Sequence, residues 1–349
     1  MPKNFLTTSN ALFYSMFLFM VLLSILSVAL TNFIHLWLLM EINTLIFISM
    51  MAMNSKNFKA TFNFFLIQSI SSMIMIFLMV LKNNLLTLNM FEWVNFMLIL
   101  SFSMKIGLFP FFYWPPLINT NLNWLMILLI STTQKFIPLM LLNLFINSIF
   151  DKSTNFLLLL LASLSSLSST IMCMNEVNIK KIMTYSSLNH LSWMIFIIIF
   201  DISLFLVYFL FYTISMQILC FFLNKFNINT FFNFIKFQSF NYKEFNFFLT
   251  LNFLIISALP PFLTFIIKIS AIKVMIEGMS LFSSFIFSLL SMFTLIFYMN
   301  VIIKMNLFSM IKTKFYFTYN LNLKFNYYLS ILLSFMSLSF LFIFYTMMN

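Results

Sequence analysis

Apolar runs follow one another along almost the whole chain and are separated by short polar stretches. A helix that crosses a bilayer needs about 20 mainly apolar residues, with polar or turn residues at its ends. The pattern predicts about eleven such helices, near 11–30, 33–53, 60–81, 93–114, 122–146, 155–174, 182–200, 203–223, 246–270, 281–303 and 326–348. We therefore expect an all-α integral membrane protein.

Composition excludes the other classes of fold. Of the 349 residues 63% are hydrophobic and 7% are charged, and the mean hydropathy is +1.06, values that no soluble chain of this length shows. With two glycines and seven prolines, the chain has few turn residues for the hairpins of a β-barrel, so its spans must be helices. The longest polar connections, 224–245 and 304–325, are too short for a folded domain, which predicts one domain over 1–349.

The charge distribution predicts how the chain lies in the membrane. The net charge is +11 and every one of the 18 basic residues is lysine, but the lysines are scattered singly, without the dense stripe that nucleic-acid binding requires. Sorted by alternate sides of the predicted spans, one side holds Lys3, Lys56, Lys59, Lys180, Lys181, Lys225, Lys236, Lys243, Lys304, Lys312, Lys314 and Lys324, and the other holds Lys82, Lys152 and Lys273. By the positive-inside rule the amino terminus lies on the lysine-rich side, and an odd number of helices places the carboxyl terminus opposite.

Residue choice indicates the genome that encodes the chain. Phe occurs 53 times and Met 29 times, and Arg is absent, so the preferred residues are those with AT-rich codons. The first ten residues contain no arginine-rich presequence. Both features favour mitochondrial encoding and the mitochondrial inner membrane, with the amino terminus in the matrix and the carboxyl terminus in the intermembrane space.

Four charged residues interrupt predicted spans, namely Glu41, Lys105, Lys135 and Lys268. Each costs about 2.5 to 3.5 kcal/mol at the centre of a membrane helix, so retention of all four by chance is improbable. A lysine near the end of a span can instead snorkel to the interface, an alternative that stays most open for Lys268. We interpret the four as a proton pathway.

Helix breakers stand beside two of these lysines. Pro110 follows Lys105, and Pro260 and Pro261 precede Lys268. A proline inside a span removes a backbone donor and frees a carbonyl, which needs a protein or water partner at bilayer depth. A single proline makes only a kink, but two breaks beside lysines are typical of the discontinuous helices of ion transporters. Two spans are therefore expected to be broken at mid-membrane.

Other polar residues accompany the buried charges. Gln134 and two threonines precede Lys135, and His190 ends a polar group within an apolar span. His190 is either a relay for protons or a packed, hydrogen-bonded histidine. Acidic residues at span ends are expected to be solvated at the membrane surface: Glu92, Asp151, Asp201 and Glu277.

The two cysteines carry no metal or redox signal. Cys173 and Cys220 lie in apolar runs and form no Cys-x-x-Cys pair, which argues against a disulfide framework, a zinc site or an iron–sulfur cluster. Both are expected to be core residues.

The buried residues occur within motifs that together resemble one family. The motifs are Met40-Glu41-Ile42-Asn43, Lys105-x-Gly107-x-x-Pro110-Phe111, Gln134-Lys135-x-x-Pro138, Lys181-x-x-x-Tyr185-Ser186-Ser187-x-Asn189-His190-Leu191-x-Trp193, and Leu259-Pro260-Pro261-Phe262-Leu263 before Lys268. In this order they resemble the NADH-ubiquinone oxidoreductase chain 2 family, the antiporter-like membrane subunits of respiratory complex I. The resemblance covers nearly the whole chain and implies a fold that lacks the first three helices of bacterial counterparts.

The resemblance implies a role for each buried residue. Glu41 and Lys105 would form the carboxylate–lysine pair of a half-channel, Lys135 the central relay, and Lys268 the residue toward the other half-channel. At an assumed separation of about 7 Å and an effective dielectric near 20, the pair would interact by roughly 2.4 kcal/mol. Three positions depart from the family's usual residues, with Phe112 in place of His, Thr133 in place of Trp and Lys180 in place of Arg. Phe112 puts a histidine role there in doubt.

The implied function is proton translocation, driven by electron transfer from NADH to ubiquinone in other subunits. This chain has no Gly-rich dinucleotide loop and no Cys cluster, so NADH, FMN, iron–sulfur clusters and ubiquinone are expected elsewhere in the assembly. The resemblance implies contact with other complex I membrane subunits, namely NADH dehydrogenase subunits 4 and 4L, and with lipids such as cardiolipin. A stand-alone cation/proton antiporter is the alternative; a purely structural subunit would leave the buried charges unexplained.

Overall fold

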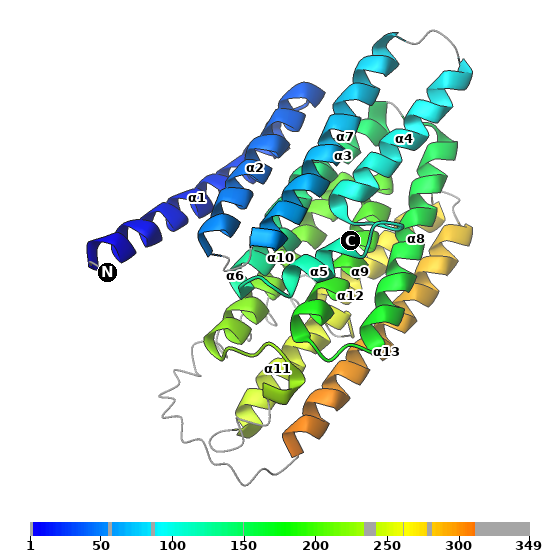
Figure 1. Ribbon diagram of the computed structural model, residues 1–349. Helices are drawn as coiled ribbons and strands as arrows, with labels where there is room; N and C mark the ends of the chain where they lie inside the picture. The colour runs from blue at the N-terminus through cyan, green and yellow to red at the C-terminus, as the bar shows by residue number, and fades with distance from the viewer. Residues whose placement is uncertain are drawn as a thin grey trace. The chain divides into compact units, whose positions relative to one another are not determined.

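The computed structural model describes residues 3–54, 58–84, 88–148, 150–233, 242–260, 262–277 and 281–310. Regular structure within these ranges is helical (Figure 1), apart from one isolated antiparallel bridge between Asn178 and Thr230. Eight of the described segments are long and apolar enough to cross a membrane, and one of them, Trp124–Ser148, consists of two consecutive helices. The expected all-α membrane fold is confirmed.

The chain divides into two compact units, Met1–Ser165 and Ser166–Asn349. We call them unit 1 and unit 2. The single domain predicted over 1–349 stays a prediction.

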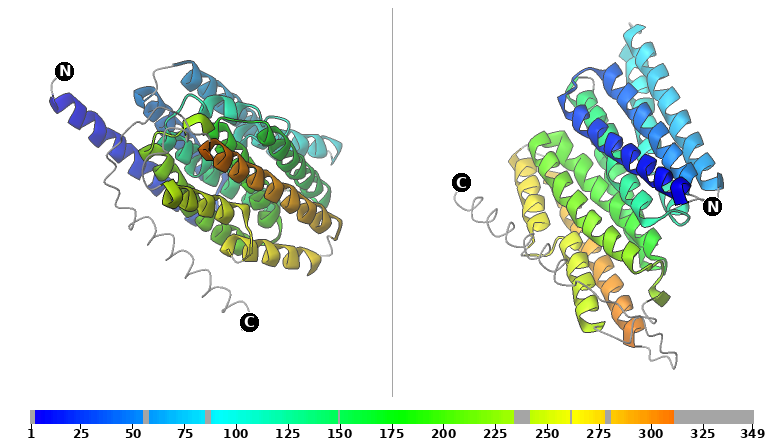
Figure 2. Two further views of the ribbon diagram at one scale, coloured as in Figure 1. Left: turned by 90° about the horizontal axis from the view of Figure 1, so that it is seen from below. Right: turned by 90° about the vertical axis from the view of Figure 1, so that its left-hand side faces the viewer.

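Unit 1 is built around its seventh helix. Its elements are α1 (Lys3–Ala29), α2 (Phe33–Asn54), α3 (Phe58–Asn84), α4 (Leu88–Ile106), α5 (Trp114–Asn119), α6 (Trp124–Ser131), α7 (Thr133–Ser148) and the first part of α8 (Lys152–Met174). Helix α7 contacts α1, α2, α4 and α6, while α3 runs along α4 and touches α5. The amino-terminal end of α1 projects beyond the other helices of the unit (Figure 2). The helices that carry Glu41 and Lys105 therefore both pack on α7, which carries Lys135.

Unit 2 contains the rest of α8 and five further described helices, α9 (Ile179–Phe200), α10 (Ile202–Lys225), α11 (Tyr242–Ser257), α12 (Leu263–Glu277) and α13 (Leu281–Met310). Helix α10 contacts α9, α11 and α12, and α13 lies along both α11 and α12. Two helices begin at a polar cap: the Asn178 side chain accepts a hydrogen bond from the Lys180 amide at 3.0 Å, and Asp201 accepts one from the Ser203 amide at 2.7 Å. Asp201 thus caps the start of α10.

Most predicted spans coincide with helices to within several residues. The spans near 11–30, 33–53, 60–81, 155–174, 182–200, 203–223 and 281–303 correspond to α1, α2, α3, α8, α9, α10 and α13. The predicted span 326–348 lies outside the described residues, and the count of about eleven stays a prediction.

Three predicted spans differ from the observed elements. The span 93–114 is too long, because α4 ends at Ile106 and the chain turns before α5. The span 122–146 consists of two helices, α6 and α7, separated at Thr132, where no break was predicted. The span 246–270 consists of α11 and α12, separated between residues 257 and 263 beside the predicted prolines. Whether these gaps lie at mid-membrane stays a prediction.

Candidate proton-translocation site

Unit 1 contains a buried ion pair. The Lys105 ammonium on α4 donates a hydrogen bond to Glu41 Oε1 on α2, with Nζ 2.8 Å from the oxygen. The Lys105 side chain is 1% exposed, whereas the Glu41 side chain is 25% exposed. The two residues predicted as a pair are in direct contact, so the assumed separation of about 7 Å was too large. The Lys105 side chain is therefore enclosed by this chain, whereas part of the Glu41 side chain is not.

The backbone turns sharply just after Lys105. Gly107 has φ +86°, a conformation that side chains with a Cβ rarely adopt. A Cβ there would lie 2.7 Å from Cγ of Pro115. The amides of Gly107 and Leu108 both donate to the Ser103 carbonyl at 2.9 Å. Gly107 therefore ends α4 about two turns earlier than the apolar pattern predicts.

Side chains satisfy the carbonyls at this helix end. Gln68 on α3 donates to the Lys105 carbonyl at 3.1 Å, and the Trp114 indole donates to the Met104 carbonyl at 3.0 Å. Helix ends inside a membrane protein need such partners, because no bulk water is there to supply them. Gln68 and Trp114 thus fix the backbone from which the Lys105 side chain extends.

Asn43 links the ion pair to the start of α7. It lies two residues after Glu41, and its side-chain nitrogen Nδ2 donates to the Thr133 backbone carbonyl at 3.3 Å. In return, Gln134 donates to the Asn43 carbonyl at 3.1 Å. Asn43 is 1% exposed, and its Oδ1 has no hydrogen-bond partner among the described residues. One helix, α2, therefore contacts both the Lys105 site and the residues beside Lys135.

Lys135 lies in the first turn of α7 and is buried. The interruption before it arises at Thr132, whose φ and ψ are −117° and −85°. The hydroxyls of Thr132 and Thr133 donate back to the carbonyls of Leu128 and Leu129 at 2.7 and 3.1 Å, a bond that bends helices. The threonines thus shape the gap before Lys135.

In unit 2, His190 lies between two tyrosines. Its Nδ1 is 2.8 Å from the Tyr208 hydroxyl on α10, and its Nε2 is 3.4 Å from the Tyr298 hydroxyl on α13. His190, Tyr208 and Tyr298 are all buried. His190 is thus a packed, hydrogen-bonded histidine in this structure, and its role as a relay stays a prediction.

Lys268 is buried within unit 2, on α12. Its Nζ lies 5.0 Å from the ring centroid of Trp193 on α9, within the range of a cation–π contact. The Trp193 indole nitrogen has no hydrogen-bond partner among the described residues. Across the gap before α12, the Thr264 hydroxyl donates to the Ile255 carbonyl at 2.8 Å. Lys268 is therefore held over an aromatic ring rather than extended to the surface of the unit.

The candidate residues fall into two groups, with Glu41, Lys105 and Lys135 in unit 1 and His190 and Lys268 in unit 2. Sequence reasoning missed Gln68, Tyr208 and Tyr298. Each is a hydrogen-bonding residue within an apolar run, the signal that could have found them. An isolated amide or phenol in a span has no charge and gives a weaker signal than a buried lysine.

No metal centre is evident in the part of the chain that the structure describes, where no three His, Cys, Asp or Glu side chains gather. Cys173 and Cys220 are buried free thiols, as expected of core residues. Phe112 is also buried.

Comparison with known proteins identifies the family. Residues 30–294 match the family described as NADH:quinone oxidoreductase/Mrp antiporter, transmembrane region. A relative in Anopheles gambiae, NADH-ubiquinone oxidoreductase chain 2, is 33% identical over 305 residues, 84% of each chain. The chain belongs to the NADH:quinone oxidoreductase/Mrp antiporter family. Its members share the antiporter-like fold that the motifs predicted.

Solved structures agree on this fold. A chain of respiratory complex I from Thermus thermophilus superposes with a TM-score of 0.77 at 14% identity, over 94% of this chain and 78% of that chain. A chain of an Mrp complex from Dietzia superposes with a TM-score of 0.62 at 12% identity, over 81% of this chain and 59% of that one. At these identities the likeness shows the fold alone.

Proposed function

We propose that this chain is an antiporter-like subunit of the membrane arm of mitochondrial complex I and moves protons across the inner membrane. The observation that carries the proposal is the ion pair between Glu41 and Lys105, a contact of 2.8 Å with a lysine side chain 1% exposed. A purely structural membrane subunit has no need for such a pair, because burying charge is costly even when it is paired. The family match, and relatives named as subunits of NADH-ubiquinone oxidoreductase, support the complex I assignment.

The ion pair works as a switch for one proton. While Glu41 contacts Lys105, the carboxylate stabilises the ammonium. Displacing α2 relative to α4, or placing another charge near Glu41, leaves the buried ammonium without its counter-charge and favours proton release. Restoring the contact recharges the lysine.

Lys135 is the next acceptor in this proposal. Asn43 ties the backbone of α2 to Thr133 and Gln134, so a movement of α2 that opens the Glu41 contact also acts on the turn that carries Lys135. The free Oδ1 of Asn43 offers an acceptor to a bound water at this place. Lys268 and His190, both in unit 2, are the further proton carriers in this proposal.

The chemistry that drives the switch lies in other chains. The sequence contains two glycines and two cysteines, too few for a dinucleotide loop or an iron–sulfur cluster, so NADH, FMN, iron–sulfur clusters and ubiquinone are assigned to partner subunits. The partners are other membrane subunits, including NADH dehydrogenase subunits 4 and 4L, together with cardiolipin. The amino terminus faces the matrix and the carboxyl terminus the intermembrane space.

The test measures protons pumped per NADH oxidised by the assembled complex in liposomes. Lys135→Met should leave assembly intact and reduce pumping, because Met preserves the volume of the buried side chain and removes the proton-binding group. Lys273→Met, at an exposed lysine on α12, is the matched control and should pump normally. Wild-type pumping by an assembled Lys135→Met complex would remove Lys135 from the path.

The same preparation tests the alternative of a stand-alone cation/proton antiporter, which the likeness to an Mrp chain keeps in view. In native electrophoresis a complex I subunit migrates with a very large assembly. A stand-alone antiporter migrates alone and exchanges protons for sodium without NADH. That second pattern would contradict the proposal.

A further inference from the structure

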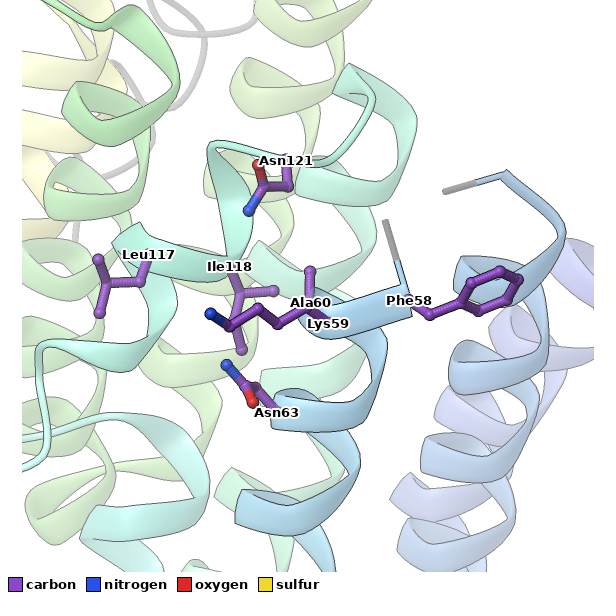
Figure 3. Close-up of a pocket in the computed structure, with 7 residues that line it drawn as sticks. All are labelled: Phe58, Lys59, Ala60, Asn63, Leu117, Ile118 and Asn121. Atoms are coloured by element: carbon purple, nitrogen blue, oxygen red, sulfur yellow. The ribbon is translucent and has the colours of Figure 1, made fainter. Parts of the chain in front are cut away.

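A pocket of about 730 Å³ lies on unit 1 and is separate from the buried ion pair. The first turns of α3 line one wall, and α5 with the turn that follows it lines the other (Figure 3). Its lining residues are Phe58, Lys59, Ala60, Asn63, Leu117, Ile118 and Asn121. We call it the Lys59 pocket. Its volume is within the range of small-ligand sites.

Three nitrogen donors converge in the pocket. Figure 3 shows the polar ends of the Lys59, Asn63 and Asn121 side chains around one shared space, and each of them has a nitrogen that can donate. Lys59 and Asn63 are four residues apart on α3 and therefore lie on the same helix face. Among the described residues, no hydrogen bond or ion pair joins any of these three side chains to another group. Donors that face one another in this way leave room for an acceptor between them.

The walls of the pocket supply no negative charge of their own. None of the lining residues is acidic. The carbonyls at the end of α5 already accept hydrogen bonds, those of Pro116, Ile118 and Asn119 from the amides two to four residues later and that of Leu117 from the Thr120 hydroxyl. The start of α3 adds the partial positive charge of a helix amino terminus. The field in the pocket therefore favours an anion.

The rim of the pocket is apolar and exposed. Phe58 is 69% exposed and Leu117 is 64% exposed, so a hydrocarbon surface borders the polar interior. A free anion has no apolar group that could pack against this rim. A phospholipid has both parts, because its phosphate fits the pocket and its acyl chains fit the rim. Lys59 is on the lysine-rich side of the predicted topology, where a headgroup of the matrix leaflet would lie.

We propose that the Lys59 pocket binds a phosphate oxyanion, carried by an anionic phospholipid. Lys59 supplies the charge, Asn63 and Asn121 supply amide donors, and the exposed rings and branches of Phe58 and Leu117 hold the acyl chains. The proposal rests on the lipid partner named in the proposed function and gives that partner a binding site. It does not rest on proton translocation, because none of these residues belongs to the buried chain of charges.

Photolabelling of the assembled complex tests the proposal. The probe is phosphatidylglycerol with a diazirine in its acyl chain, added as a tracer to phosphatidylcholine vesicles that contain the complex. Labels should map to peptides 58–63 and 117–121. Lys59→Met should reduce this labelling about fivefold, and Lys59→Arg should retain it. Lys152→Met is the matched control, since Lys152 is also an exposed lysine at the start of a helix, and should change nothing at these peptides.

Two further arms identify the ligand. Equal labelling by a phosphatidylcholine probe with the same acyl chain, or undiminished labelling of Lys59→Met, would overturn the proposal. Competition by millimolar inorganic phosphate as strong as that by unlabelled phosphatidylglycerol would support the oxyanion site and assign it to free phosphate. The number of protons pumped per NADH by the Lys59→Met complex should equal that of the wild type. Loss of lipid labelling at the pocket can therefore be told apart from loss of proton translocation.

Discussion

The contact between Glu41 and Lys105 predicts unequal effects for its two single mutants. At 2.8 Å and an effective dielectric of about 20, the Coulomb attraction is about 6 kcal/mol before desolvation is subtracted. Removing one partner of a buried pair costs about 3 to 5 kcal/mol, because the other charge is left without compensation. Glu41→Gln strands an ammonium on a side chain 1% exposed, whereas Lys105→Met strands a carboxylate on a side chain that is 25% exposed and is therefore less enclosed by this chain. Glu41→Gln should therefore be the more damaging change.

A double-mutant cycle measures this interaction in the assembled complex. The four forms are the wild type, Glu41→Gln, Lys105→Met and the double mutant, compared by thermal midpoint and by protons pumped at fixed NADH oxidation. The double mutant should be no worse than Glu41→Gln alone, because the two residues act as one unit. The coupling free energy should be about 2 to 3 kcal/mol.

The matched control is Glu92→Gln, which removes an exposed carboxylate at the other end of the helix that carries Lys105. It should leave both readouts unchanged. Strictly additive losses in the cycle would show that Glu41 and Lys105 work independently and would refute the switch. Equal damage from the two single mutants would refute the inference from their unequal exposure.

Three more predictions follow from particular contacts. Gly107→Ala should destabilise the assembled complex by about 1 to 3 kcal/mol, because φ is +86° and the new Cβ would lie 2.7 Å from the Pro115 ring. An unchanged thermal midpoint would contradict the inference that a left-handed Gly107 ends α4. Tyr208→Phe removes the hydroxyl 2.8 Å from His190 and should lower pumping per NADH without preventing assembly; wild-type pumping would leave His190 a packing residue. An impermeant amine reagent should label the exposed Lys59 from the matrix side and the exposed Lys152 from the intermembrane side; the opposite result would invert the topology.

The helices could be predicted from the sequence because a bilayer imposes one simple requirement, about 20 apolar residues per span. That requirement says little about where a helix stops inside the apolar run. α4 ends at Ile106 because Gly107 adopts a left-handed conformation and Gln68 and Trp114 satisfy the freed carbonyls. α6 ends at Thr132 without a proline. Both ends depend on hydrogen bonds to other groups, which hydropathy does not contain.

For the candidate site, too, the sequence predicted one part and only the tertiary structure decided the rest. The cost of burying charge singled out Glu41, Lys105, Lys135 and Lys268 from the sequence, because each charge stands against an apolar background. Tertiary packing alone decided that Glu41 touches Lys105 at 2.8 Å. It likewise decided that Lys268 lies over Trp193 and that Asn63 and Asn121 lie beside Lys59 in one pocket. A residue's type sets what its burial costs, whereas its partner is set by which helices pack together, and that information is spread over contacts between residues far apart in the chain.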